Sequence, residues 1–227
     1  MIISKKVYLL PILALFISSC LTGSKQEQVL DQLVMTLEFT NINNRIIVQQ
    51  DTVEIDTLRF LYGKTTVQDG SNDTLVINNN TIQVTHRSAI DDEIKGLANG
   101  SFNSDNIYNN LAFEIKQAEQ SDAGSGSNFD VDAFIEGDSN DLRYSMILSG
   151  TYNGNYFEFK SNRNFNFEFP ISDQTDGNQS SLLYNLPLKT NVSLWFNNES
   201  GDGLLNPGDT ANATAINDNI QSSMTFN

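Results

Sequence analysis

Residues 197–209, NNESGDGLLNPGD, place oxygen-bearing side chains at nearly every second position around their glycines. A calcium ion takes about six to eight oxygen ligands, and a twelve-residue loop supplies them from alternate residues around a glycine at its sharp turn. Leu205 then occupies the position at which such loops carry an apolar anchor. Setting Gly203 at the sharp turn predicts the ligands Asn198, Ser200, Asp202, the carbonyl oxygen of Leu204, Asn206 and Asp209.

The predicted calcium site contains only two carboxylates, Asp202 and Asp209. We therefore expect weak affinity, with a dissociation constant on the order of 10⁻⁴ to 10⁻³ M. The same residues fit a second interpretation without an ion, in which a Gly-Asp-Gly turn leads into a helix and Asp209 caps that helix. The sequence leaves both interpretations open.

Trp195 is the only tryptophan and precedes this loop directly, in the stretch SLWF. In a strand it would face the opposite side from Leu194 and Phe196. If that side meets solvent, Trp195 and nearby tyrosines predict a platform on which sugar rings stack. If that side is covered, Trp195 is a core residue between two packed sheets.

Few other residues suggest catalysis. The run Asp91-Asp92-Glu93 could supply the paired carboxylates of a glycoside hydrolase or a second cation site, or it could begin a short helix, whose dipole favours acidic residues there. His86 is the only histidine and Cys20 the only cysteine, so a conventional zinc site is not expected. No G-x-S-x-G motif occurs. We therefore expect a protein that is not an enzyme.

The first 20 residues, MIISKKVYLLPILALFISSC, have the pattern of an export signal. Two lysines precede an apolar run that is too short to span a bilayer, and small residues follow it. The ending Ile17-Ser18-Ser19-Cys20 resembles the lipobox of bacterial lipoproteins, which implies acylation of Cys20 and cleavage before it. The alternative is an ordinary secretory signal with a chance cysteine, but an unpaired thiol suits an oxidising compartment poorly unless it is modified.

The charge balance bears on partners and location. The chain has 13 basic and 28 acidic residues, and loss of the signal with Lys5 and Lys6 leaves 11 basic residues against 28 acidic ones. Such a surface repels nucleic acid and attracts cations. We expect no nucleic-acid partner, and a membrane partner only through lipid on Cys20, because several acyl chains give stable anchoring without a transmembrane helix.

Alternation of apolar and polar residues dominates the chain beyond the polar tether of residues 20–31. This two-residue period is typical of half-buried strands and occurs in residues 33–39, 53–62, 157–159, 165–169 and 192–196. The stretch MILSGTYNGNYFEFK predicts a hairpin, because Asn153-Gly154 suits a type I′ turn. The pattern predicts an all-β fold, an antiparallel β-sandwich of the immunoglobulin-like or a related kind, as one domain over residues 32–227.

Three further local structures are expected from shorter patterns. Residues 90–97, IDDEIKGL, favour a short helix, and residues 209–222 favour a C-terminal helix. Leu75–Ile77 and Ile82–Val84 flank a polar tetrapeptide and predict a second hairpin.

Three stretches together carry a resemblance to a known group of proteins. They are VEIDTLRFLYG, MILSGTYNGNYFEFK with the following NFNFEF, and SLWFNNESGDGLLNPGDTANATAINDNIQSS. They resemble uncharacterised β-sandwich lipoproteins of the Bacteroidota type, in which a Trp-Phe strand leads into an acidic Gly-rich loop and a helix containing N-I-x-x-S. The resemblance implies a sandwich fold and an outer-membrane location, and it implies no activity.

Together these patterns predict residues 1–19 as a lipoprotein signal peptide followed by a lipid-anchored domain of the outer membrane. We expect a non-enzymatic envelope protein with a structural or ligand-binding role, stabilised by one calcium ion near its C-terminus. The first alternative is a glycan-binding module of a polysaccharide-uptake system, and the second is a hydrolase that uses two carboxylates. Envelope proteins and glycans are the partners expected.

Overall fold

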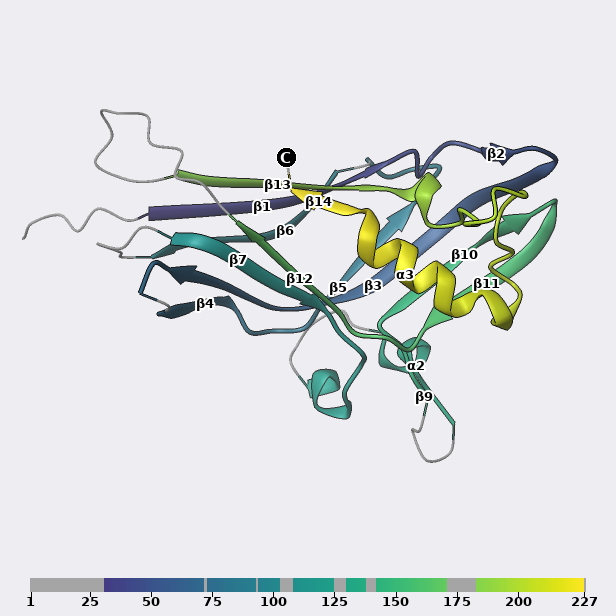
Figure 1. Ribbon diagram of the computed structural model, residues 1–227. Coiled ribbons are helices and arrows are strands. Elements are labelled where there is room, and N and C mark those ends of the chain that lie inside the picture. Colours follow the sequence, from purple (N-terminus) through teal and green to yellow (C-terminus); the bar gives the residue numbers. More distant parts are fainter. Residues whose placement is uncertain are drawn as a thin grey trace, which may run out of the picture.

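Two β-sheets form the framework of the protein (Figure 1). The computed structural model describes residues 31–71, 73–92, 94–102, 108–124, 130–137, 142–170 and 183–226. The helical segments among them are short: η1 (Gln120–Gly124), α2 (Val131–Phe134), η2 (Val192–Leu194), η3 (Thr210–Asn212) and α3 (Ala213–Ser223). The predicted all-β sandwich and its C-terminal helix are confirmed.

The smaller sheet places the first strand of the domain in its interior. Its strand order is β14 (Met224–Phe226), β13 (Leu183–Asn191), β1 (Asp31–Thr40) and β6 (Ile94–Phe102). β1 runs antiparallel to β6 but parallel to β13. A parallel pair requires a crossover connection, and here all strands of the larger sheet lie between β1 and β13 in the chain. Among the strand pairs that the structure describes, β1–β13 is the one parallel pair, and the others are antiparallel.

The larger sheet is organised around the 19-residue strand β3 (Asp51–Asp69). One edge of β3 pairs in turn with β2 (Ile46–Val48), β5 (Ile82–Arg87) and β4 (Thr74–Asn78). Its other edge pairs first with β10 (Met146–Tyr152), which continues to β11 (Asn155–Ser161). Beyond Phe60 that edge pairs with β7 (Tyr108–Ile115), which continues to β12 (Phe165–Pro170).

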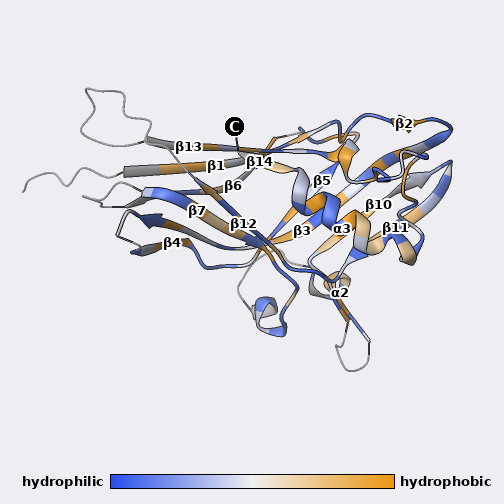
Figure 2. Cartoon of the chain, in the orientation of Figure 1, coloured by the Kyte–Doolittle hydropathy of each residue, from blue (hydrophilic) through white to orange (hydrophobic). Residues whose placement is uncertain are grey.

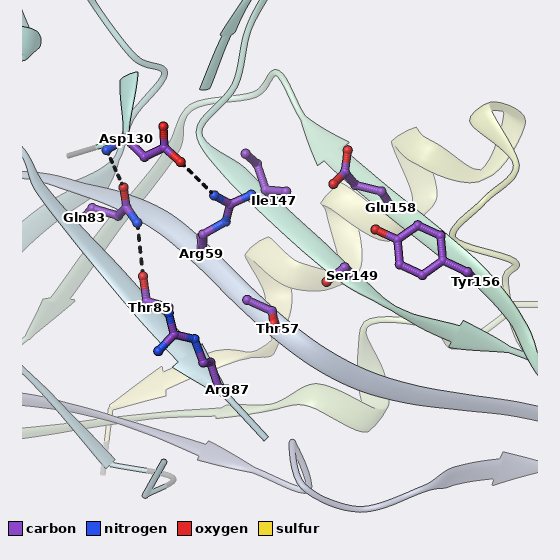
Figure 3. Close-up of a pocket in the computed structure, with 10 residues that line it drawn as sticks. All are labelled: Thr57, Arg59, Gln83, Thr85, Arg87, Asp130, Ile147, Ser149, Tyr156 and Glu158. Carbon is purple, nitrogen blue, oxygen red and sulfur yellow. Dashed lines mark hydrogen bonds and ion pairs between the residues drawn. The ribbon is translucent and has the colours of Figure 1, made fainter. Parts of the chain in front are cut away.

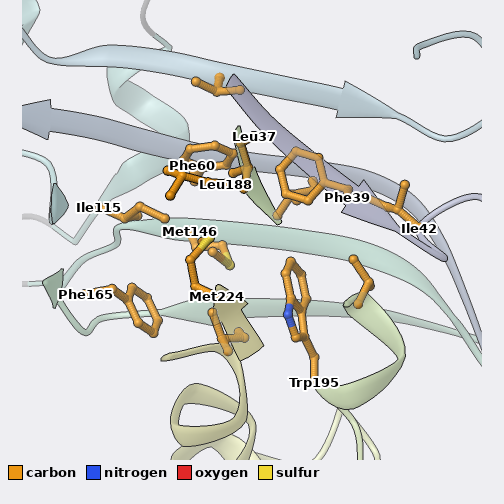
Figure 4. Packing of buried hydrophobic residues seen from close by; sticks show 14 of the residues in the cluster. Leu37, Phe39, Ile42, Phe60, Ile115, Met146, Phe165, Leu188, Trp195 and Met224 are labelled. Carbon is orange, nitrogen blue, oxygen red and sulfur yellow. The ribbon is translucent and has the colours of Figure 1, made fainter. Parts of the chain in front are cut away.

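One continuous hydrophobic core lies between the two sheets. It joins residues of β1, β3, β7, β10 and β11 with residues of β13 and α3, and Figure 4 shows part of this packing. The alternation seen in the sequence explains it, because Val53, Ile55, Leu58 and Phe60 all face inward from β3. Figure 2 shows hydrophobic residues along the strands of both sheets, and hydrophilic residues at the tip of the β10–β11 hairpin. Helix α3 contacts β13 of one sheet and both β11 and β12 of the other.

The β10–β11 hairpin forms as the sequence predicts. Its turn residues have positive φ, 51° at Asn153 and 79° at Gly154, as a type I′ turn requires. The register aligns Tyr152 with Asn155 and continues to Met146 opposite Ser161. Four strands of the larger sheet, β5, β3, β10 and β11, therefore lie side by side in fixed register.

The predicted helix over residues 90–97 was wrong. Residues 94–102 form strand β6, which supplies the second edge of β1. Leu97 is buried there, whereas Ile94 is 56% exposed, so the two residues do not share one covered helix face. Before β6 the chain makes a turn in which Ile90 and Asp91 donate their backbone N–H groups to the carbonyl of Arg87.

The predicted hairpin over residues 75–84 was also wrong. β4 and β5 do not pair with each other, because both pair with β3 at successive positions. The 19-residue strand β3 is long enough to pair with both β4 and β5 along one edge. The residues between β4 and β5 therefore form a short connection along that edge and not a hairpin turn.

The N-terminal residues 1–30, which include Cys20 and the signal, lie outside the described residues. Within the described ranges, the structure has no helix with the length and apolarity needed to cross a membrane.

Candidate functional site

The residues predicted to bind calcium lie on two consecutive turns. Asn197 and Leu204 form an isolated antiparallel bridge, and Leu205 donates its N–H to the carbonyl of Phe196 over 2.7 Å. This pairing closes residues 197–204 into a hairpin-like loop that contains Asn198, Ser200 and Asp202. The glycine predicted at the sharp turn, Gly203, has φ of 84°, and Leu205 is buried as the apolar-anchor position requires.

The remaining predicted ligands belong to the turn that follows. The side-chain oxygen of Asn206 accepts from the N–H of Gly208, and the Asp209 carboxylate accepts from the N–H of Ala211. Asp209 thereby caps η3, which leads directly into α3. The Leu204 carbonyl accepts from the hydroxyl of Tyr152 over 3.3 Å. The helix-capping role proposed for Asp209 is confirmed, and calcium binding stays a prediction.

Asp51 on β3 anchors this loop, a contact that sequence reasoning missed. One of its oxygens accepts from the backbone N–H of Leu204 at 3.0 Å, and the other accepts from the side-chain amide of Asn153 at 2.9 Å. A Cβ atom on Gly203 would collide with this carboxylate. Asp51 therefore joins the loop to the tip of the β10–β11 hairpin, although 153 positions separate it from Leu204.

The pKa of Asp51 lies below its ordinary value of 3.8, first because of the Asn153 amide and second because of the Leu204 N–H. A lowered pKa in the folded state contributes stability above pH 3.8, which is lost as pH falls through the folded-state value. We expect Asp51→Asn to melt at a lower temperature than wild type at pH 7 and to show a weaker loss between about pH 5 and pH 3. Thermal melts over this range check this, with the exposed Glu199→Gln in the same loop as control. An unchanged pH profile in Asp51→Asn would contradict the anchoring role.

Calorimetric titration tests the calcium prediction directly. We expect wild-type protein to release or absorb heat on addition of calcium, with a dissociation constant on the order of 10⁻⁴ to 10⁻³ M. The variant Asp202→Ala should lose most of that heat, because it removes one of the two predicted carboxylate ligands. Absence of heat in wild type, or equal heat in both proteins, would disprove the site.

Trp195 is a core residue, 1% exposed (Figure 4). Its indole N–H lies 2.8 Å from the hydroxyl oxygen of Ser223 and 3.1 Å from that of Thr190. This burial contradicts the prediction that Trp195 forms a sugar-stacking platform. The cause is local, because the Asn191 side chain accepts from Ser193 and turns the chain into η2 instead of a strand. Trp195 and its neighbour Phe196 can then both be buried, although in a strand their side chains would point to opposite faces.

The acidic run at 91–93 serves a turn as far as it is described. The Asp91 carboxylate accepts from the N–H of Arg87 and forms an ion pair with Lys95 at 3.4 Å. The hydrogen bond from Arg87 lowers the pKa of Asp91 first, and Lys95 lowers it further. Glu93 lies outside the described residues.

A different site appears on the outer face of the larger sheet, away from the core. Ten residues of β5, β3, β10, β11 and the segment before α2 line a hollow of about 450 Å³, which we call the outer trough (Figure 3). The register places Arg87, Thr57, Ser149 and Glu158 in one row across the four strands. The two middle residues of this row have short hydroxyl side chains, and the two end residues have long charged ones. The short side chains leave a hollow between the longer ones.

The rim of the trough beside β5 is held by α2 and its packing. Phe134 of α2 is buried in a small second hydrophobic cluster with Leu61 and Ile147 on the outer face of the sheet. Arg59 lies with its guanidinium 5.8 Å from the centre of the Phe134 ring and pairs with Asp130 at 3.4 Å. The backbone N–H of Asp130 donates to the side chain of Gln83 at 3.0 Å. Arg59 and Asp130 are thus positioned by each other and by α2.

The opposite rim carries an exposed aromatic ring and a second charged network. Tyr156 is 70% exposed and occupies the next row, opposite Thr151. Glu158 forms an ion pair with Lys160 at 3.1 Å, and Lys160 forms a second ion pair with Glu136. Glu136 belongs to strand β8 (Ile135–Glu136), which is hydrogen-bonded to strand β9 (Leu142–Arg143).

This network shifts the pKa values of its members. Burial alone would lower the pKa of Lys160, but the two carboxylates outweigh it and raise the pKa above its ordinary value. The hydrogen bond from Lys160 lowers the pKa of Glu136. Lys160 therefore stays charged and holds Glu158 at the rim.

Sequence reasoning missed the outer trough because its residues are individually ordinary. Each is an outward-facing residue of a strand, and their common row depends on the pairing of four strands. One signal was present, since Ser149 and Tyr156 flank the Asn153-Gly154 turn on the solvent side of a predicted hairpin.

Comparisons with known proteins give no relative: no family model, no curated protein and no solved structure matches this chain.

Proposed function

We propose that this chain is a non-enzymatic, lipid-anchored protein of the outer membrane that binds glycans in the outer trough. The observation that supports glycan binding most strongly is the composition of the trough. Thr57 and Ser149 offer hydroxyl groups on its floor, charged side chains stand at its ends, and the exposed ring of Tyr156 lies beside it. A sugar presents hydroxyl groups on its edge and C–H groups on its face, so it suits hydrogen bonding to the former and ring contact with the latter.

The shape of the trough also favours a chain-like ligand. Small-molecule pockets are mostly apolar and enclose their ligand, whereas this hollow is polar and open along the sheet (Figure 3). A polysaccharide segment can lie in such a hollow and leave it at both ends. The glycan-binding alternative thus keeps its support after Trp195 is found in the core, because Tyr156 takes the place of the aromatic contact.

The carboxylates of the trough support a binding role over hydrolysis. Glycoside hydrolases use two carboxyl groups, one of them as a protonated acid. Asp130 and Glu158 are the carboxylates that line the trough, and each is the partner of a cation, Arg59 and Lys160 respectively. Such pairs fix side chains in place for recognition.

Lipid anchoring is proposed from the sequence around Cys20, and the orientation of the domain is compatible with it. In Figure 1, β1 begins at one end of the sandwich, and the tip of the β10–β11 hairpin lies at the other end. A tether that leads from Cys20 into β1 would therefore hold the domain by the end remote from that tip. Tyr156, two residues beyond the turn, would then face away from the membrane.

A glycan array with purified soluble domain tests this function. We expect binding to at least one polysaccharide class, and we expect Tyr156→Ala to weaken it by about tenfold, which corresponds to about 1.4 kcal/mol. The control is Ile47→Ala, which removes an apolar side chain that is 60% exposed outside the trough. Absence of binding across neutral and acidic glycans would overturn the proposal, and so would equal loss in both variants.

A further inference from the structure

We infer that the outer trough selects glycans that carry carboxylate groups, and that Arg87 is the residue that recognises the carboxylate. This inference rests on the proposed function and specifies its ligand class. It follows from the charges of the trough, from which of them are already paired, and from the order in which they lie across the sheet.

The trough has a direction. Its central row runs from Arg87 on β5 through Thr57 and Ser149 to Glu158 on β11. Neighbouring strands lie about 4.8 Å apart, so three strand intervals place the backbones of the two end residues about 14 Å apart. A cation stands at one end of this distance and a carboxylate at the other, with hydroxyl groups between them. A ligand that fills the row therefore meets unlike groups at its two ends.

The two arginines of the trough differ in what they already bind. The Arg59 guanidinium is engaged by the Asp130 carboxylate and by the Phe134 ring. Arg87 uses its backbone N–H for Asp91, and no side chain in the part of the chain that the structure describes pairs with its guanidinium. Its side chain is exposed at the rim. Arg87 is thus the cation of the trough whose donors are available to a ligand.

The guanidinium favours a carboxylate for geometric reasons. Its planar set of donors matches the two oxygens of a carboxylate, so it can form two parallel hydrogen bonds, and each is stronger than a bond between neutral groups. The chain as a whole carries a formal charge of −15. An acidic glycan therefore approaches a surface that repels it, and binding requires a local cation that offsets this repulsion. At the other end, Glu158 accepts hydrogen bonds from sugar hydroxyl groups.

A pair of matched ligands tests the inference. The probes are short oligomers of galacturonate, glucuronate and mannuronate, each compared by calorimetry with its methyl ester, which has the same chain without the charge. We expect at least one acid to bind about tenfold to a hundredfold more tightly than its ester. Arg87→Gln should abolish this preference, so that the variant binds acid and ester with equal affinity. Arg163→Gln, which removes an arginine that pairs with Asp218 outside the trough, should keep it.

Each other outcome has a definite meaning. If acid and ester bind equally, or if Arg87→Gln keeps the preference, the inference is wrong and the proposed glycan binding stands. If a sulfated oligosaccharide without carboxylates binds as tightly as the acids, the trough recognises anions in general and the inference is wrong in its ligand class. If no oligosaccharide binds, acidic or neutral, the proposed function itself is overturned. Arg87 is exposed, so its variant should fold, and a thermal melt verifies this.

Discussion

Replacing Trp195 by alanine should lower the free energy of unfolding by about 3–5 kcal/mol, the range found for removal of a large buried aromatic side chain. The indole lies in the core between the sheets and is 1% exposed. Its removal leaves a cavity in the core cluster to which Phe39 and Met224 also belong (Figure 4). A domain of this size has a total stability of about 5–15 kcal/mol, so the variant would lose a large share of it.

Two further variants separate packing from hydrogen bonding at Trp195. Trp195→Phe keeps most of the ring but loses the N–H that bonds to Thr190 and Ser223. These two hydroxyl groups also bond to each other at 2.8 Å, so neither is left without a partner. We therefore expect a smaller loss, about 1–3 kcal/mol. The control is Leu194→Ala, because Leu194 is adjacent but 41% exposed.

Urea unfolding followed by circular dichroism measures these losses. Tryptophan fluorescence is unsuitable because Trp195 is the only tryptophan of the chain. The packing argument is contradicted if Trp195→Ala costs no more than Leu194→Ala.

Gly150→Ala should be equally damaging, with a loss of at least about 3 kcal/mol or failure to fold. Gly150 lies in β10, where the register with β3 shifts. A Cβ atom there would overlap the carbonyl oxygen of Glu54 and lie 3.0 Å from its carbonyl carbon and 3.1 Å from the Cα of Ile55. These are backbone atoms of β3 and cannot rotate away. The two strands must separate, and this would also disturb the floor of the outer trough at Ser149.

A second strand glycine provides the matched control. Gly96 lies in β6, and a Cβ atom built on it meets no other atom within 4 Å. We expect Gly96→Ala to be neutral or to stabilise by up to about 1 kcal/mol, because alanine restricts the unfolded chain. Thermal melts of both variants decide the point. If Gly150→Ala and Gly96→Ala melt together, close contact between β3 and β10 is not what requires a glycine at residue 150.

The sequence predicted those features that depend on neighbouring residues. Alternation located the strands, and Asn153-Gly154 located the hairpin, because both signals lie within a few positions of the structure that they specify. Prediction from the sequence failed where a partner distant in the chain decides the conformation. Residues 94–97 become a strand because β1, more than fifty positions earlier, needs a second neighbour.

The candidate site shows the same division. Asp209 caps a helical turn two residues ahead, and this local role was predicted. Asp51 binds the backbone N–H of Leu204 from a strand that is far away in the sequence. No local pattern near either residue predicts this hydrogen bond. Strand alternation left two alternatives for Trp195, a solvent-facing platform or the core. It could not decide between them because residues 192–194 form η2 and not a strand. The outer trough requires the register of four strands, and only a structure supplies that.

The parallel pairing of β1 with β13 has a consequence for the order in which the domain can be made. Among the strands that the structure describes, β1 is synthesised first and its partner β13 is among the last, so the smaller sheet cannot close until nearly the whole polypeptide is present. Before then β1 has an open edge, which can pair with another chain. Contacts of such long sequence separation also slow folding. A chain that stops before residue 183 would therefore be prone to aggregate, and a chaperone that covers the early strand would raise the yield of the complete protein.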